Sequence, residues 1–225
     1  KVLNIFIRVN SGGTKLSYSD LLLSIATAQW KTKDAREEIT SFVDEINNIG
    51  EGFEFDKDFV LKSCLVLSDL SDIAFKVDNF SNKNMAIIEK KWEDIEKSIK
   101  LAVDLISGFG YSLQTLTSAN AIIPIAYYIM KIGIPDTFVQ ASKYQNERVS
   151  IKKWLAMSLI KKTFSGQPDN VLRPIRAIMQ DQMQGFPIVV MIEKFKGTTK
   201  AVTFTNDDVE NLFYSKYGQG HTFSV

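Results

Sequence analysis

Apolar residues recur at intervals of three or four along most of this 225-residue chain. The pattern is strongest over residues 84–107, where the apolar positions fall on one stripe of a helix: Ile87, Ile88, Trp92, Ile95, Ile99, Val103 and Ile106. Alternating apolar and polar runs between turn residues, which are typical of strands, are scarce. The sequence therefore predicts an all-α, multi-helix globular fold.

The same spacing predicts a series of further helices. Their ranges are 2–9, 17–30, 34–48, 56–70, 121–130, 149–164, 169–183 and 205–217. Residues 186–195 are ambiguous, because Val189, Val190 and Ile192 suit a strand while Phe186 and Val190 share a helical face. We favour the helix there.

Several residues mark where these helices begin and what they bury. Ser118 or Asn120 can cap the helix at 121–130, and Pro124 and Pro174 are expected close to helix starts, where a missing N–H costs least. The helix at 121–130 is apolar nearly all round, which predicts a central, buried position. The three tryptophans lie on apolar stripes and are expected in the core: Trp30, Trp92 and Trp154.

The composition bounds the size and the compartment. Because 45% of the residues are hydrophobic, the chain can bury a sizeable core, and we expect a single helical domain over residues 1–225. One cysteine excludes an internal disulfide, which fits a reducing, cytoplasmic location. No apolar stretch approaches the roughly 20 residues that cross a bilayer, so no membrane partner is expected.

Charge is distributed unevenly, although the formal net charge is only +1. Acidic residues dominate residues 31–110, and basic residues dominate residues 143–176. The basic part supplies six candidate nucleic-acid-binding residues: Lys152, Lys153, Lys161, Lys162, Arg173 and Arg176. The same residues can instead lie on solvated helix faces that bind no ligand, which is the interpretation we favour. The sequence leaves both interpretations open.

The turn at residues 8–14 is the best local candidate for a ligand. Its glycines let backbone N–H groups approach an anion, and a predicted helix follows. The candidate phosphate-binding residues are Arg8, Asn10, Ser11, Gly12 and Gly13. The alternative is a helix C-cap in which the glycines serve only the backbone geometry.

No catalytic residue and no metal ligand can be nominated. The sequence has no Walker loop, nucleophile elbow or dinucleotide fingerprint. Its single histidine, His221, lies in a glycine-flanked tail, so neither a His-rich metal site nor a Cys–His pair can be built. The acidic pair Glu37–Glu38 falls where the first turn of a helix is expected to be acidic. No cofactor is expected in this chain.

The start of the chain resembles a motif of the GmrSD-type restriction endonuclease family. The matching residues are Phe6, Arg8, Asn10, Ser11, Gly12, Gly13, Thr14, Leu16, Ser17, Asp20 and Leu21. Further segments are similar to the helical part of these proteins in the same order: residues 75–80, Trp92, residues 116–128, and the Trp154 helix leading to residues 164–166. The resemblance therefore extends over most of the chain.

This resemblance implies that the chain is an internal helical part of a longer DNA-targeting restriction or phage-defence protein. Such proteins begin with a ParB-like domain that carries an Asp-Gly-Gln-Gln-Arg motif, and many end in a His-Asn-His nuclease domain. Residues 1–30 would then join the ParB-like lobe, and residues 205–225 would lead into the nuclease. The parent protein would use a nucleotide and a divalent metal ion, and its partners would be DNA and those two domains. The rival hypothesis is a non-catalytic helical module that binds another protein.

Overall fold

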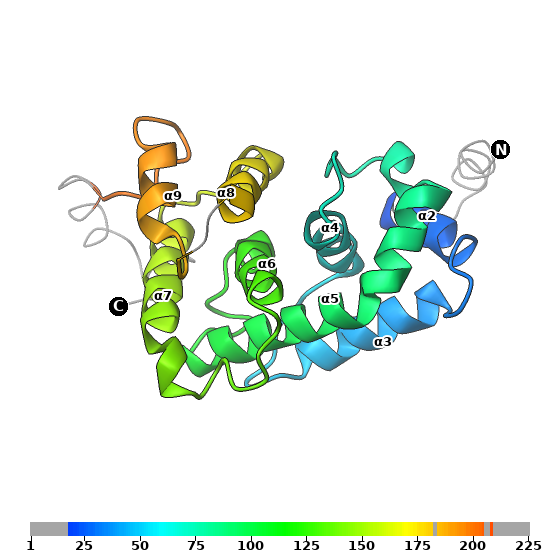
Figure 1. Ribbon diagram of the computed structural model, residues 1–225, viewed down its shortest axis with the longest axis horizontal. Coiled ribbons are helices and arrows are strands. Elements are labelled where there is room, and N and C mark those ends of the chain that lie inside the picture. The colour runs from blue at the N-terminus through cyan, green and yellow to red at the C-terminus, as the bar shows by residue number, and fades with distance from the viewer. Residues whose placement is uncertain (1–17, 182–183, 205–207, 209–225) are drawn as a thin grey trace.

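The computed structural model describes residues 18–181, 184–204 and 208, and within them the chain forms eight α-helices and no strand. This confirms the all-α prediction. The long helix α5 (Asn82–Gly108) runs along the molecule, with α2 (Tyr18–Thr27) and α3 (Ala35–Asn47) beside its first half (Figure 1). Helices α4 (Lys57–Leu67), α6 (Ile123–Lys131) and α8 (Asp169–Asp181) follow one another across its upper side, and α7 (Gln145–Ile160) and α9 (Ile188–Phe195) form the far end.

Aspartate side chains start two of the predicted helices. Asp34 accepts hydrogen bonds from the Arg36 and Glu37 amides at 2.8 and 3.2 Å, and Asp56 accepts from the Phe59 amide at 2.8 Å. Each bond satisfies an amide that has no partner inside its helix. The predicted starts at residues 34 and 56 are confirmed, with these residues as the caps.

The apolar stripe of α5 is buried as the spacing predicts, and the tryptophans lie in the core. Trp92 is fully buried, and its ring meets those of Trp30 and Phe42 edge-on at centroid distances of 5.4 and 5.8 Å. Trp154 is buried at the far end of the molecule against Phe164. After Gly108, Gly110 adopts a φ of +92°, a left-handed conformation that glycine tolerates best, and this ends the helix.

Helix α6 occupies the central position that its sequence predicts. Its residues from Ile123 to Ile129 are all buried, and it packs against α4, α5 and α8. Pro124 lies in its first turn, as expected. The predicted caps Ser118 and Asn120 are wrong, because no side chain caps this helix. The chain instead enters through a short 3₁₀ helix, η2 (Ala119–Ala121), whose backbone bonds satisfy the first amides.

Two details of the later helices differ from the predicted ones. Helix α7 begins and ends four residues before the predicted range of 149–164, because its polar first turn is fixed by Arg148, which donates to the Phe138 and Ala141 carbonyls. A left-handed Lys162, with a φ of +50°, follows its end. Pro174 was expected at the start of α8 but is its sixth residue. At this interior position it removes one hydrogen bond of the helix. The favoured helix at 186–195 is confirmed by α9.

Three predicted features lie outside the described residues: the helix at 2–9, the helix at 205–217 apart from Asp208, and His221. Within the described part, one cluster of buried apolar residues extends from Leu21 in α2 to Phe195 in α9. None of the helices described there is long and apolar enough to cross a bilayer.

Candidate functional site

A cavity of about 540 Å³ opens where the start of α4, the loop before η1 (Val77–Phe80), η2 and the start of α8 meet. Its walls combine aromatic, amide and charged side chains, and its size falls within the range of small-ligand sites. The lining residues are Asp56, Asp58, Phe59, Lys62, Ala74, Phe75, Ala119, Asn120, Gln167, Pro168 and Asp169. Four segments that are distant in the sequence therefore share this cavity.

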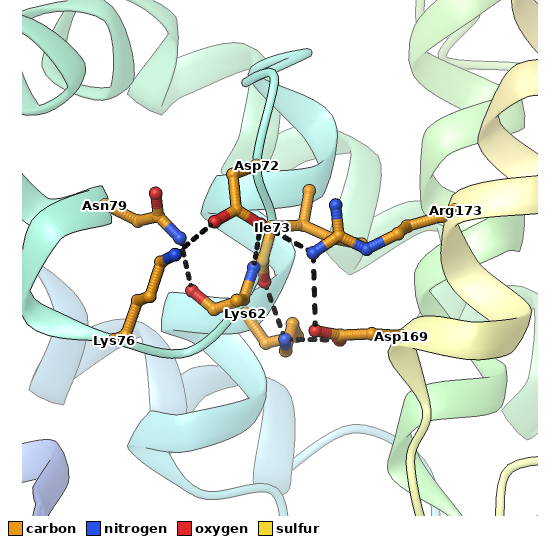
Figure 2. Close-up of polar contacts among 8 residues, drawn as sticks. Lys62, Asp72, Ile73, Lys76, Asn79, Asp169 and Arg173 are labelled. Atoms are coloured by element: carbon orange, nitrogen blue, oxygen red, sulfur yellow. Dashed lines mark hydrogen bonds and ion pairs between the residues drawn. The ribbon is translucent and has the colours of Figure 1, made fainter.

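Lys62 lies in the cavity wall although residues 59–67 of its helix are all buried, and only 8% of the residue is exposed. Its Nζ donates to the Ile73 carbonyl at 2.7 Å and to Asp169 Oδ1 at 2.6 Å, as Figure 2 shows. The same Nζ lies 5.8 Å from the centre of the Phe75 ring. A buried ammonium is strongly destabilising without such partners, so Ile73 and Asp169 fix its position.

Arg173 extends the network from α8 to the loop that follows α4 (Figure 2). Its Nη2 donates to Asp72 Oδ1 at 2.5 Å and lies 3.9 Å from Asp169 Oδ2. Lys76 pairs with Asp72 Oδ2 at 2.8 Å, and Asp72 also accepts the Ala74 amide at 3.0 Å. These donors, Arg173 first and Lys76 next, hold the pKa of Asp72 well below its usual range. Asp72 is therefore an anion at physiological pH.

A second polar cluster joins the end of α4 to α6 and α8. Asp69, whose φ is +58°, accepts hydrogen bonds from Tyr127 Oη at 2.5 Å, Lys131 Nζ at 2.9 Å and Gln180 Nε2 at 2.8 Å. Burial acts to raise the pKa of Asp69, but these three hydrogen bonds outweigh it and lower the pKa. Together the two clusters join both ends of α8 to α4 and to the loop that follows it.

The paired charges of these clusters suit them to fixing helices in place and to binding. The cations Lys62, Lys76 and Arg173 face the carboxylates Asp72 and Asp169, so most of the charge is compensated internally. In residues 18–181, 184–204 and 208, no group of three or more His, Cys, Asp or Glu side chains could hold a metal ion.

The six predicted nucleic-acid-binding residues fall into two groups. Lys152, Lys153 and Lys162 are exposed. The other three are turned toward the protein. Lys161 Nζ pairs with Asp208 at 2.6 Å, Arg173 belongs to the Asp72 network, and Arg176 Nη1 is buried with no hydrogen-bond partner among the described residues. The structure does not bring the six together as one exposed cluster. The predicted phosphate-binding residues lie outside the described part: Arg8, Asn10, Ser11, Gly12 and Gly13.

The sequence interpretation missed Lys62, Asp72 and Asp169 as members of one site. One signal was present, because Lys62 interrupts a helix in which residues from Phe59 to Leu67 are otherwise apolar or small. A lysine at such a position is rarely buried unless it is paired. Its partner, Asp169, lies 107 positions further along the chain. The sequence predicted Asp169 only as the start of a helix.

An acidic cluster between α3 and α5 gives a pH-dependent prediction. Burial, and next the charge of Glu38, raises the pKa of Glu96 to about 7, with Glu45 and Glu93 adding to the effect and Lys33 opposing it. The folded chain thus holds this proton more tightly than the unfolded chain, so the free energy of unfolding falls as pH rises from about 4.5 to about 7.

We expect Glu96→Gln to stabilise the protein at pH 8 by about 1 kcal/mol, after allowance for solvent screening of this partly exposed group. The gain should vanish at about pH 4 and below, where Glu96 is protonated in both the folded and the unfolded chain. Urea unfolding at both pH values measures the difference. Glu37→Gln, at an exposed position of α3, is the control and should show no such dependence. A gain that is equal at both pH values would contradict the assignment.

Comparison with family models and with curated proteins gives no relative of this chain, so only geometry describes the network and its cavity.

Proposed function

We propose that this chain is the helical body of a GmrSD-type, DNA-targeting defence protein that acts in the cytoplasm. The observation that supports this most is where the resembling segments lie. Residues 75–80 and 116–128 contribute Phe75, Ala119 and Asn120 to the wall of the 540 Å³ cavity, and residues 164–166 directly precede its Gln167. Two of the segments that resemble this family thus line the cavity and a third adjoins it in sequence, as expected of a shared functional surface.

The role of such a body is to hold a ParB-like lobe and a nuclease lobe in a fixed relation. The ion pairs and hydrogen bonds of Lys62, Asp69 and Arg173 suit this role, because they join α4 to α8 across the buried α6. A rigid connection keeps two lobes in register better than a loop does. In this proposal the nucleotide and divalent metal ion belong to those lobes.

The surface that contacts DNA in this proposal is the exposed side of α7. Lys152 and Lys153 lie on this helix, and Lys162 follows its end. Lys161 and Arg173 are less suited to phosphate contacts because each already has a carboxylate partner. The proposed contact set is therefore narrower than the basic stretch of the sequence.

The DNA contact predicts the effect of removing these lysines. We expect the chain to bind duplex DNA at low salt, and the triple variant Lys152→Ala, Lys153→Ala, Lys162→Ala to bind at least about tenfold more weakly. Fluorescence anisotropy with a labelled duplex measures both. The control removes the exposed lysines of α5 (Lys83, Lys90 and Lys97), which lowers the net charge equally. No binding at low salt, or the same loss in both variants, would contradict the proposed surface.

The family assignment has its own test in the gene on either side of this segment. The proposal predicts an Asp-Gly-Gln-Gln-Arg motif before Lys1 and a His-Asn-His motif after Val225. Finding neither would overturn the assignment whatever the chain binds.

A non-catalytic protein-interaction module is the second candidate, and one observation favours it. Val149, Val189 and Val190 are 61, 74 and 54% exposed on the neighbouring helices α7 and α9. Exposed branched apolar residues are typical of contact surfaces. This function predicts that Val189→Ser abolishes capture of a protein partner while DNA binding is absent from the unchanged chain.

A further inference from the structure

A second cavity adjoins the first one. It has a volume of about 180 Å³ and is lined by Phe53, Glu54, Phe55, Leu113, Leu116, Thr117 and Ala119. Ala119 belongs to the walls of both cavities, so the two are neighbours, and together we call them the acidic groove. Their lining residues extend from Leu113 to Asp169 at the start of α8.

The segment before α4, together with the first turn of α4, places buried aromatic residues beside exposed carboxylates. Phe53 and Phe55 are buried, whereas Glu54, Asp56 and Asp58 are exposed. The aromatic rings form a stack, with Phe53–Phe55 and Phe55–Phe59 centroid distances of 5.2 and 4.6 Å. Apolar pockets in the floor thus alternate with carboxylates at the rim.

Hydrogen bonds hold this segment in place. The Asn47 side chain accepts from the Phe55 amide at 2.7 Å and donates to the Phe55 carbonyl at 2.9 Å. On the other side, the Leu113 amide donates to the Gly52 carbonyl at 2.8 Å. The rim and floor are therefore preorganised, which lowers the entropy cost of binding.

The negative charge of the rim is not compensated within the described residues. Glu54 and Asp58 form no ion pair there, and Asp56 only caps α4. The cation in the wall, Lys62, is already bound to Asp169 at 2.6 Å. The nearest other lysine in the sequence, Lys57, lies 3.4 Å from Asp20. A positively charged ligand would compensate the negative charge of these rim carboxylates.

Apolar surface remains open beside these charges. Leu113 is 52% exposed at the mouth of the smaller cavity, although it is a large hydrophobic residue. A small amine or metal ion would leave this surface in contact with water. Nucleic acid is disfavoured as well, because its phosphates would face Glu54 and Asp58.

We propose that the acidic groove binds an extended segment of a partner protein in which lysine or arginine alternates with apolar residues. The basic side chains pair with Glu54, Asp56 and Asp58, and the apolar side chains enter the pockets around Leu113 and Ala119. Alternation is required because successive side chains of an extended segment point to opposite sides. The groove serves this role whether or not α7 contacts DNA.

The test uses the whole 225-residue chain and a short labelled peptide that alternates Lys and Leu. We expect the peptide to bind in fluorescence anisotropy, and the double variant Glu54→Gln, Asp58→Asn to bind at least about tenfold more weakly. Leu113→Ser should also weaken binding, since it removes an apolar contact at an exposed site. The control double variant, Glu37→Gln with Asp94→Asn, removes equal charge at exposed positions elsewhere and should bind as the unchanged chain does.

Several outcomes overturn the proposal. If both double variants lose the same affinity for the Lys–Leu peptide, net charge alone would explain the binding. The same would follow if a Lys–Ser peptide bound as tightly as the Lys–Leu peptide. Equal binding of a Glu–Leu peptide would leave only apolar contact. Displacement of the peptide by spermidine at equal concentration would indicate a small-amine site, and a dimer that Leu113→Ser dissociates would place a second copy of the chain in the groove.

Discussion

Replacing Trp92 with alanine is expected to lower the free energy of unfolding by about 4 kcal/mol. The side chain is fully buried in α5, and its ring contacts those of Trp30 and Phe42. Its Nε1 also donates to Glu38 Oε2 at 2.8 Å, which joins α5 to α3. Alanine would leave a cavity between α5, α3 and the loop after α2, and would leave the Glu38 carboxylate without this donor.

Urea unfolding followed by circular dichroism measures this loss, and a second substitution separates its two causes. Trp92→Phe keeps most of the ring contact but removes the Nε1 donor, so it should cost about 1–2 kcal/mol. If Trp92→Ala costs less than about 1 kcal/mol, Trp92 does not hold α3 against α5. If Trp92→Phe costs as much as Trp92→Ala, the hydrogen bond and not the packing dominates.

Breaking the Lys62–Asp169 pair is expected to give the second large effect. Lys62→Met should destabilise by about 3 kcal/mol, because Asp169 loses its closest cation and the Ile73 carbonyl loses its donor. Asp169→Asn should cost a similar amount, because it leaves a buried ammonium beside a neutral amide. Both losses are of the size found when one partner of a buried ion pair is removed.

The double variant Lys62→Met, Asp169→Asn distinguishes a paired interaction from two separate ones. We expect it to be more stable than the sum of the single losses predicts, by at least about 1 kcal/mol, since neither charge is then left alone. Lys76→Met, at an exposed position of the same network, serves as the control and should cost much less than either of these single variants. Additive losses for Lys62 and Asp169 would show that the contact does not join α4 to α8.

Periodicity predicted the helices well where the signal is local. The stripe of α5 and the starts at Asp34 and Asp56 depend on residues within a few positions of one another. The entry to α6 was mispredicted because the 3₁₀ turn at residues 119–121 satisfies the same amides that a serine or asparagine cap would. Pro174 was expected nearer the start of its helix because an interior proline loses the hydrogen bond to the carbonyl four residues before it. Helix α8 nevertheless continues through Pro174, held in the core by its buried residues Val171, Leu172, Ile175 and Met179.

The candidate site was far less predictable because it depends on how helices face one another. Helix α4 is buried on nearly every side, so its sequence does not show which side meets α8. Lys62 and Asp169 therefore look unrelated until the fold is known. For the basic stretch, the sequence left open whether residues close in sequence share one face or lie on separate solvated faces. Lys161 and Arg173 instead turn to Asp208 and Asp72, and Lys152 and Lys153 remain exposed.

The salt dependence of duplex DNA binding tests the central proposal, a DNA-contacting helical body, most directly. Each lysine that neutralises a phosphate contributes about 0.9 to the slope of log K against log salt concentration. For the unchanged chain we expect log K to decline linearly with log salt concentration, and the slope to be shallower by about 2 to 3 when Lys152, Lys153 and Lys162 are replaced by alanine. The Lys83, Lys90 and Lys97 control should keep the original slope. Identical slopes for all three proteins, or no measurable binding at low salt, would contradict the account.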